Sequence, residues 1–421
     1  MEARRPDSAR PDELHPGSVS AISVLMVIPS DAVEGRTVSP STCIAGLPLL
    51  RRIILAATRA GFRQILLHPA CAAEDRGLLA GTTATVIAPD ERVPPLPRSR
   101  IVLLATHILP QVKWLRALSE MSIESERLYA DGCSAAIIET GDPDAVLTEA
   151  VRCGGARELF ESLGEVFKTA DRPLSQDGRF SLTTPQAVPR AEDWLLGGLV
   201  KEAEGFMSRH VERRISLAIT RRLAGTRITP NVMTLVSLGV GLVGAPFFLS
   251  PTPVYQLTGA LLLLTHSILD GCDGELARLK FQESRWGSLL DFWGDNVVHV
   301  ALMACIAIGL SLTIQAAWPL GLGGVAVAGV LLTAGFVYRH TREDTTIAGP
   351  LFPDGGRKPA DWLPRMVDML ARRDFIYLVV LLSAAGKATW FLALAAVGTP
   401  IFFVVLVWIA RAEARRRELP S

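Results

Sequence analysis

The sequence lacks the patterns that mark a disulfide-bonded, zinc-binding or nucleic-acid-binding protein. Its six cysteines are scattered, and none of them forms a CxxC pair. Such spacing predicts neither a zinc site nor a disulfide framework, and it favours a reducing compartment. The formal net charge is only +1, so no overall excess of basic residues indicates a nucleic acid as partner.

Long apolar runs are missing from the first half of the chain. Residues 1–20 are rich in Pro, Arg, Asp and Ser, which predicts a disordered N-terminus without a signal peptide that stays in the cytoplasm. The long apolar runs all lie after residue 230. Because 421 residues suffice for more than one domain, we expect a soluble part followed by a membrane part.

Residues 21–200 alternate between short apolar runs and helical segments, which predicts a soluble α/β domain. Strands separated by helices favour a parallel sheet that is covered on both faces. Residues 161–200 contain Pro and Gly and form the end of this domain and a connector. The predicted strands include 22–28, 63–68, 99–106 and 135–139, and the predicted helices include 48–61 and 144–153.

A basic amphipathic helix is predicted just before the membrane part, within residues 201–230. Apolar residues recur at helical spacing from Met207 to Ile219, and five arginines between Arg209 and Arg222 occupy much of the remaining surface. Such a helix suits the headgroup region of a cytoplasmic leaflet. Two roles stay open for the arginines, namely the positive-inside rule and the binding of a substrate phosphate.

Residues 231–421 are predicted to form an all-α membrane domain of six helices. The fifth apolar run has roughly 12 residues, where about 20 are needed to span a bilayer. We still expect six spans, because Lys and Arg then gather on one side and both termini lie in the cytoplasm, with the protein in the cytoplasmic (inner) membrane. The apolar runs are 232–249, 254–269, 288–314, 317–338, 375–386 and 389–410.

Four aspartates stand in two pairs at the start of this membrane part. Asp270 and Asp273 are three residues apart, and Asp291 and Asp295 are four apart. Each pair therefore occupies one face of its own helix. The same faces carry small residues, which let a helix backbone or a ligand approach closely. These are Gly274, Ala277 and Gly287.

The four aspartates form a carboxylate cluster at the edge of a membrane, where each buried carboxylate costs about 2.5–3.5 kcal/mol. Carboxylates without His or Cys ligands select Mg²⁺ or Mn²⁺, and these ions bind phosphate oxygens in turn. Two ions and a further carboxylate are suited to displacement at phosphorus. A solvated loop would not need two helical pairs with small residues. A cation transporter would need acids along a pore and usually an internal repeat.

The pattern Asp270-x2-Asp273-Gly274-x2-Ala277-Arg278-x8-Gly287-x3-Asp291-x3-Asp295 resembles the signature of the CDP-alcohol phosphotransferase (phosphatidyltransferase) family. The resemblance implies two divalent ions, Mg²⁺ or Mn²⁺, on Asp270, Asp273 and Asp291, with Asp295 completing the metal-binding set. It also implies that Asp295 is the catalytic base that takes the proton of the acceptor hydroxyl. The residues implied for the CDP moiety are Gly274, Ala277, Arg278 and Gly287. For Arg278, anchoring to lipid headgroups is an equal alternative to pairing with a phosphate.

The segment Gly46-Leu47-Pro48-Leu49-Leu50-Arg51-Arg52, followed by Ala60-Gly61-Phe62 and a strand, looks like part of the sugar-phosphate nucleotidyltransferase fold. Departures from that family predict a domain that is inactive in cytidylyl transfer. The loop after the first strand keeps at most Gly35 and Arg36 and lacks the family's Lys, so it is a poor phosphate cradle. Thr106 stands where a metal-binding Asp is expected, and residues 181–185 read SLTTP without an acid. We expect the neighbouring His107 to be packed or at the surface rather than catalytic.

The whole layout resembles the fused inositol-1-phosphate cytidylyltransferase and di-myo-inositol phosphate phosphate synthase family. Arg213-Arg214-Ile215-Ser216 and Thr229-Pro230-Asn231-x2-Thr234 ahead of the first span strengthen this likeness. We predict transfer of a substituted phosphoryl group from a CDP-alcohol to an acceptor hydroxyl, with release of CMP. An inositol-phosphate-type donor and CDP-diacylglycerol both stay open. The implied partners are the CDP-alcohol, the alcohol acceptor and membrane lipid, with no nucleic acid, and a homodimer through the membrane helices is left open.

Overall fold

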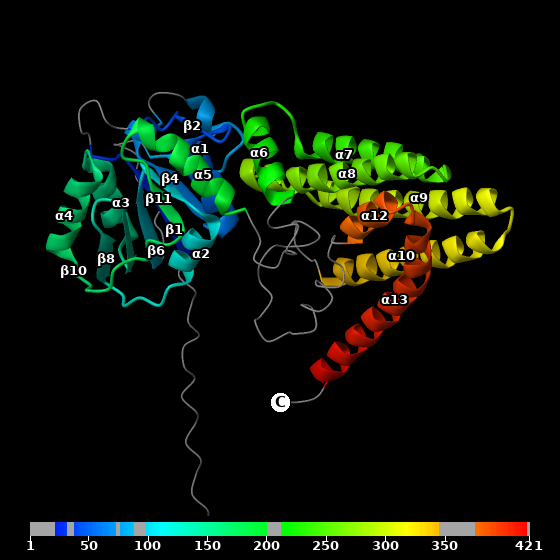
Figure 1. Cartoon of the computed structure of the whole chain (residues 1–421). Coiled ribbons are helices and arrows are strands. Elements are labelled where there is room, and N and C mark those ends of the chain that lie inside the picture. The colour runs from blue at the N-terminus through cyan, green and yellow to red at the C-terminus, as the bar shows by residue number, and fades with distance from the viewer. Residues whose placement is uncertain are drawn as a thin grey trace, which may run out of the picture. The chain divides into compact units, whose positions relative to one another are not determined.

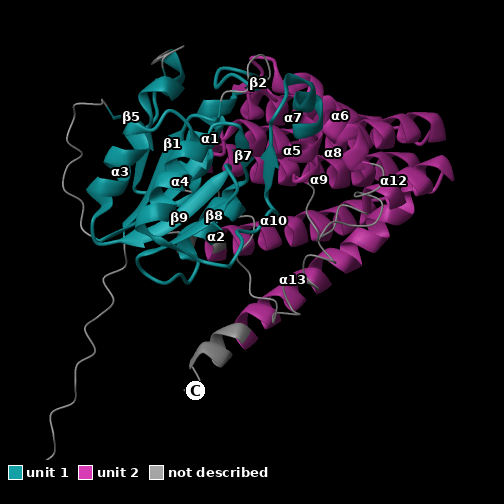
Figure 2. Ribbon diagram, turned by 90° about the vertical axis from the view of Figure 1, so that its left-hand side faces the viewer, with its two compact units in different colours: residues 1–43, 48–191 teal, residues 44–47, 192–421 magenta. Residues whose placement is uncertain are grey.

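The computed structural model describes residues 22–31, 38–72, 76–87, 98–199, 212–344 and 375–418 (Figure 1). Two units make up the chain (Figure 2): residues 1–43 with 48–191, and residues 44–47 with 192–421. Several sequence predictions lie outside the described residues. These are the disordered segment 1–20, Gly35 and Arg36, and the first part of the amphipathic helix with Met207 and Arg209.

The first unit is built on a seven-stranded sheet with the order β10-β8-β9-β6-β1-β4-β5. At its centre, β1 (Ile22–Ile28) runs parallel to β4 (Gln64–Leu67) on one side and to β6 (Ser99–Ala105) on the other. Continuous apolar runs form these strands because a parallel sheet is buried on both faces. The predicted strands therefore appear where the sequence places them.

The prediction of an all-parallel sheet is wrong at β9 (Ala135–Thr140). This strand runs antiparallel to both β6 and β8 (Arg127–Asp131). The reason is the connection between β8 and β9, which is only residues 132–134. A parallel pair needs a crossover of about a dozen residues or more, so this short turn permits only an antiparallel pair.

The helices of the first unit form two contacting pairs. The pair α1 (Leu49–Ala60) and α2 (Val112–Glu120) contacts β4 and β6, and the pair α3 (Pro143–Arg152) and α4 (Ala156–Val166) contacts β1 and β8. Helix α1 ends at Gly61, whose φ of 95° is the left-handed conformation of a helix C-cap. The shorter strands are β2 (Cys43–Ile44), β3 (Leu47–Pro48), β5 (Thr85–Val86), β7 (Ile108–Pro110), β10 (Lys168–Thr169) and β11 (Arg179–Ser181), and α5 (Val188–Gly197) follows them.

The second unit is helical, and each of the six predicted apolar runs contains a helix. Four of its described segments are long and apolar enough to cross a membrane: Pro230–Leu249, Arg285–Ile314, Trp318–His340 and Ala388–Ala412. Helix α8 falls short because polar residues such as Gln256 and His266 interrupt its apolar run, and α12 is only ten residues long. The helices are α6 (Arg213–Ala224), α7 (Pro230–Gly244), α8 (Pro253–Lys280), α9 (Arg285–Ile314), α10 (Trp318–Asp344), α12 (Phe375–Ala384) and α13 (Ala388–Glu418).

Helices α7, α8 and α9 run side by side (Figure 1) around an apolar core to which α8 contributes Leu263 and α9 contributes Val298 and Leu302. Helix α6 packs on α8 through a second cluster that contains Cys272 and Leu276. Because α7 and α8 are joined by a short connection, they are antiparallel neighbours. The N-terminus of α7 therefore meets the C-terminal half of α8, where the aspartates begin.

Candidate active site

A tight connection places the two aspartate pairs opposite each other. Helix α8 ends at Lys280, and its C-cap Phe281 has a φ of 57°, in the left-handed region that non-glycine residues seldom adopt. Helix α9 starts at Arg285, and the preceding Ser284 side chain caps it by accepting a hydrogen bond of 3.0 Å from the Gly287 N–H. The connection 281–284 therefore folds the first turns of α9 back against the last turns of α8.

Three of the four aspartates form one cluster. Carboxylate oxygens of Asp270, Asp291 and Asp295 lie within 4.8 Å of one another. Asp270 is 4% exposed, and Asp291 Oδ1 is buried without a hydrogen-bond partner among the described residues. Buried carboxylates this close repel one another unless a cation or a shared proton compensates their charge. The oxygen-only donor set and the unpartnered Asp291 oxygen fit a hard divalent cation such as Mg²⁺ or Mn²⁺.

Asp273 lies beside this cluster and has a protein partner of its own. Its Oδ2 accepts a hydrogen bond from the Thr234 hydroxyl on α7, and the residue is buried. Thr234 belongs to the motif noted before the first span, but the sequence alone did not pair it with an aspartate. The hydrogen bond fixes the Asp273 carboxylate at the wall of a pocket.

His266 is a neighbour of the aspartates that the sequence analysis missed. Its Nε2 lies 3.5 Å from Asp295 Oδ1, and its Nδ1 lies 2.9 Å from the Ser237 carbonyl oxygen. A carbonyl only accepts hydrogen bonds, so Nδ1 carries the proton that binds the ring to α7. His266 stands four residues before Asp270 on α8, and this helical spacing was the signal that could have identified it.

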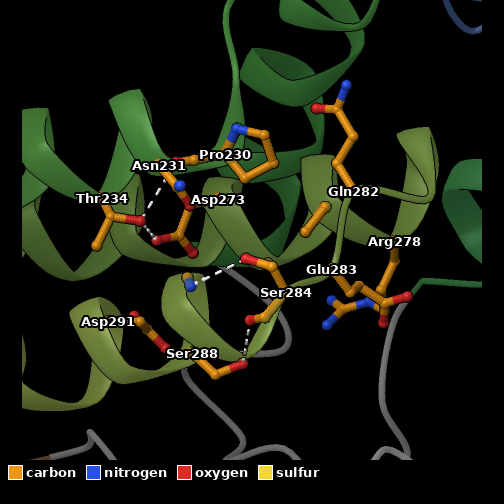
Figure 3. Close-up of a pocket in the computed structure, with 13 residues that line it drawn as sticks. Pro230, Asn231, Thr234, Asp273, Arg278, Gln282, Glu283, Ser284, Ser288 and Asp291 are labelled. Carbon is orange, nitrogen blue, oxygen red and sulfur yellow. Dashed lines mark hydrogen bonds between the residues drawn. The ribbon is translucent and has the colours of Figure 1, made fainter. Parts of the chain in front are cut away.

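A cavity of about 160 Å³ opens between α7, α8 and the start of α9 (Figure 3). It contains all four residues that the sequence implicated in CDP binding: Gly274, Ala277, Arg278 and Gly287. Asp273 and Asp291 lie on one side of the cavity and Arg278 on the other, beside Glu283 (Figure 3). Lining residues to which the sequence analysis gave no role are Pro230, Asn231, Thr234, Gln282, Glu283, Ser284 and Ser288.

Two polar side chains lie so close to the Gly287 backbone that they leave no room for a larger residue. A Cβ at this position would lie 2.9 Å from Asn231 Oδ1 and 3.1 Å from Ser284 Oγ. At Gly274 the nearest atom to an added Cβ is Arg278 Nη1, at 3.5 Å. The two glycines therefore act differently, since Gly287 permits a close helix contact and Gly274 leaves space inside the cavity.

The strand ends of the first unit present hydroxyl groups where the nucleotidyltransferase likeness expects a carboxylate. Thr106 follows β6, and its Oγ1 lies 3.0 Å from Ser30 Oγ at the end of β1. Burial holds the pKa of His107 below its ordinary value. The nearby Asp31 opposes this shift, and Arg179 adds to it. Within the described residues, the aspartate cluster of the second unit is the only group of three side chains with metal-ligand geometry.

Comparisons with known proteins found a matching family model and several relatives. Residues 227–415 match the family model for CDP-alcohol phosphatidyltransferases. A bifunctional IPC transferase and DIPP synthase of Thermococcus kodakarensis is 38% identical over 131 residues, which cover 31% of this chain and 29% of the relative. The protein of the same name from Rubrobacter xylanophilus is 34% identical over 209 residues, or 49% of this chain and 43% of the relative. The chain thus matches less than half the length of these relatives.

Two further proteins are similar to somewhat less than half of the chain. A CDP-diacylglycerol–serine O-phosphatidyltransferase of Mycobacterium leprae is 29% identical over 192 residues, which are 44% of this chain and 59% of the relative. The crystal structure of the Mycobacterium tuberculosis phosphatidylinositol phosphate synthase with CDP-DAG bound has 21% sequence identity and a TM-score of 0.32. That alignment covers 46% of this chain and 94% of the synthase.

Proposed function

We propose that residues 227–415, which match the family model for CDP-alcohol phosphatidyltransferases, transfer a substituted phosphoryl group from a CDP-alcohol to an acceptor hydroxyl. One observation carries the proposal. A single cavity joins Gly274, Ala277, Arg278 and Gly287 to two aspartates, Asp273 and Asp291. Asp291 also belongs to the three-carboxylate cluster, so a nucleotide in the cavity has its diphosphate next to the carboxylates.

The metal-binding set in this proposal is Asp270, Asp273, Asp291 and Asp295, with two Mg²⁺ or Mn²⁺ ions. When bound, the ions neutralise the diphosphate and stabilise charge on the transferring phosphoryl group. Asp270 and Asp291 face each other from α8 and α9, which fits a shared ion. Asp273 reaches the site from the cavity wall, where the Thr234 hydroxyl holds its other oxygen.

Asp295 acts as the general base in this scheme. Its carboxylate takes the proton of the acceptor hydroxyl while the hydroxyl oxygen forms a bond to the β-phosphorus. The bond from the β-phosphorus to the bridging oxygen breaks, and CMP leaves with that oxygen. His266 holds Asp295 at the inner side of the cluster, because its ring is itself held by the Ser237 carbonyl.

Arg278 pairs with a phosphate of the donor rather than anchoring the helix to lipid headgroups. It lines the cavity opposite Asp273 and Asp291 (Figure 3), which supports this choice. A guanidinium group presents a planar fork of donors that matches phosphate oxygens.

The first unit is proposed to be a nucleotidyltransferase-like domain that is inactive in cytidylyl transfer. In support, α1 and β4 follow Gly46-Leu47-Pro48 as the likeness to that fold requires. The Thr106 hydroxyl is bonded to Ser30 and brings no carboxylate to the strand ends. We expect the full chain to release no diphosphate from CTP and inositol 1-phosphate.

An inositol-phosphate-type CDP-alcohol is the proposed donor, and CDP-diacylglycerol is the alternative. The bifunctional relatives support the first, and the mycobacterial serine transferase supports the second. A cation transporter is the rival from another class of protein. Such a transporter would move cations across a vesicle membrane and would release no CMP.

The test is CMP release by the purified protein with Mg²⁺ or Mn²⁺, from CDP-inositol, CDP-diacylglycerol and CDP-glycerol in turn. Each donor is offered inositol phosphate, inositol, glycerol phosphate and lipid acceptors. We expect release from CDP-inositol, its loss with EDTA and its loss in Asp291→Ala. Release from CDP-diacylglycerol alone would assign the protein to the phospholipid synthases, and no release from any pair would refute the proposed reaction.

A further inference from the structure

Helix α8 carries two buried charges that do not belong to the aspartate cluster. Glu275 is 0% exposed and Lys280 is 8% exposed. They are opposite in sign and five residues apart on the helix, and neither is among the described residues that line the cavity. Burying a charged group costs several kcal/mol of folding free energy unless hydrogen-bond partners compensate it. The partners of Glu275 and Lys280 therefore show which parts of the fold these two residues stabilise.

Glu275 holds helix α6. Its Oε1 accepts hydrogen bonds of 2.6 Å from Arg213 Nη1 and 2.6 Å from Ser216 Oγ. Its Oε2 accepts a hydrogen bond of 2.7 Å from Thr220 Oγ1. The three donors follow one another along a single face of α6, so one carboxylate fixes two turns of that helix against α8.

Lys280 holds the segment that joins α6 to α7. Its Nζ donates to the carbonyl oxygens of Thr226 at 2.8 Å, Ile228 at 3.0 Å and Leu223 at 3.4 Å. An ammonium group has three donors and no acceptor, so these carbonyls use its full capacity. Leu223 lies in the last turn of α6, and its carbonyl also accepts hydrogen bonds from the Thr226 N–H at 3.0 Å and the Thr226 hydroxyl at 2.8 Å.

The segment held by Lys280 leads directly into the wall of the cavity. Ile228 is two residues before Pro230, where α7 starts, and within the described chain the N-cap Thr229 makes no side-chain capping bond. The next turn carries Asn231, which lies against Gly287, and Thr234, which bonds Asp273. The position of this wall therefore depends on Lys280.

We propose that Lys280, supported by Glu275, is a positioning residue for the donor nucleotide, acting through residues 225–229 and the first turn of α7. The inference rests on the proposed function, because it assumes that a CDP-alcohol fills the cavity. Loss of the Lys280 contacts lets the α7 wall move away from Gly287 and weakens donor binding. The acceptor and the chemical step depend on Asp270, Asp291 and Asp295, which α8 and α9 carry. Asp295 is linked to α7 through His266, but only at Ser237, which lies beyond the first turn of α7.

The experiment uses steady-state kinetics of CMP release by the full chain, with donor and acceptor varied in turn. Lys280→Met keeps the length of the side chain and removes its three donors, and Lys280→Arg keeps the charge. For Lys280→Met we expect the donor KM to rise roughly tenfold, with kcat and the acceptor KM within about twofold of wild type. Lys280→Arg should recover part of the loss.

The matched control is Lys387→Met, at an exposed lysine of the same unit that packs over the Trp390 ring. It should leave all three constants unchanged. An unchanged donor KM in Lys280→Met, or a fall in kcat alone, would overturn the inference. If Lys280→Met does not fold, Glu275→Gln replaces it, with a smaller rise in donor KM expected and an unchanged KM again decisive against the inference.

CMP release by the wild-type protein distinguishes failure of the proposed function from failure of this inference. Absence of CMP release from every donor would refute the reaction and leave the positioning role to be decided by binding. Calorimetry of CDP with Mn²⁺ then compares the wild type with Lys280→Met. Weaker binding by the variant would support the role of Lys280, and equal binding, or none by either protein, would overturn it.

Discussion

Gly287 shows how the absence of one methyl group defines the cavity. An added Cβ would approach Asn231 Oδ1 and Ser284 Oγ at 2.9 and 3.1 Å, closer than ordinary contacts. We expect Gly287→Ala to push Asn231 away and to raise the donor KM several-fold, with a smaller effect on kcat. Gly274→Ala is the informative comparison, because its Cβ would occupy the cavity rather than a helix contact. Equal donor KM values for Gly287→Ala and the wild type would contradict the role of this contact.

A substitution at Asp295 tests proton transfer separately from donor binding. Asparagine has the same size but cannot take a proton from the acceptor hydroxyl, so Asp295→Asn should lower kcat by about 10²–10⁴-fold. The CDP-alcohol should still bind, because the cavity residues and Asp291 are unchanged. Single-turnover CMP release and calorimetric donor binding measure the two effects separately. Near-normal turnover would remove Asp295 from the proposed mechanism.

The sequence predicted the residues of the cavity better than their partners. The resemblance to the family implied that Gly274, Ala277, Arg278 and Gly287 share one site, while helical periodicity alone fixes only which residues lie on one face of each helix. It could not show that Asp273 bonds Thr234, since that contact depends on how α7 packs on α8. The approach of His266 to Asp295 was missed for the same reason.

At the scale of elements, apolar runs predicted where helices lie but not how every strand runs. All six runs in the second unit are helical, because continuous apolar sequence leaves a membrane helix as the favoured structure. The direction of β9 was predicted wrongly, because the turn at 132–134 that reverses the chain was not recognised. In α6, the buried face carries Ser216 and Thr220 while Ile215 is exposed, so hydroxyl groups contact α8 beside the apolar Ile219 and Leu223.

Helices α10 and α13 depend on small residues where they cross. A Cβ at Gly329 would lie 2.7 Å from Thr399 Cβ, whereas a Cβ at Gly321 of the same helix would meet no atom within 4 Å. We expect Gly329→Leu to lower the free energy of unfolding by about 1–3 kcal/mol through overpacking. Gly321→Leu should be nearly neutral. Thermal unfolding in detergent measures the difference, and equal melting temperatures would show that α10 and α13 do not need this contact.

At the scale of the whole molecule, the short helix α12 decides the topology. Its ten residues rise about 15 Å, which is half of a bilayer core of about 30 Å. Yet Gly386, in the turn after α12, approaches Pro253 at the start of α8, since an added Cβ there would lie 3.4 Å from Pro253 Cγ. The turn between α12 and α13 therefore reaches the level of the connection before α8. We propose on this basis that both termini and the aspartate site share the cytoplasmic side.

Impermeant maleimide labelling of intact cells tests this topology. Thr252 and Lys387 are exposed in two of the three turns assigned to the outer side, and Glu283 lies beside the cavity. We expect labelling of Thr252→Cys and Lys387→Cys above the level of the parent protein, and none of Glu283→Cys until the cells are opened. A tag after Ser421 should behave like Glu283→Cys. Labelling of Thr252→Cys without Lys387→Cys, together with a tag accessible from outside, would mean that α12 does not complete a span, because the C-terminus would then lie opposite the aspartate site.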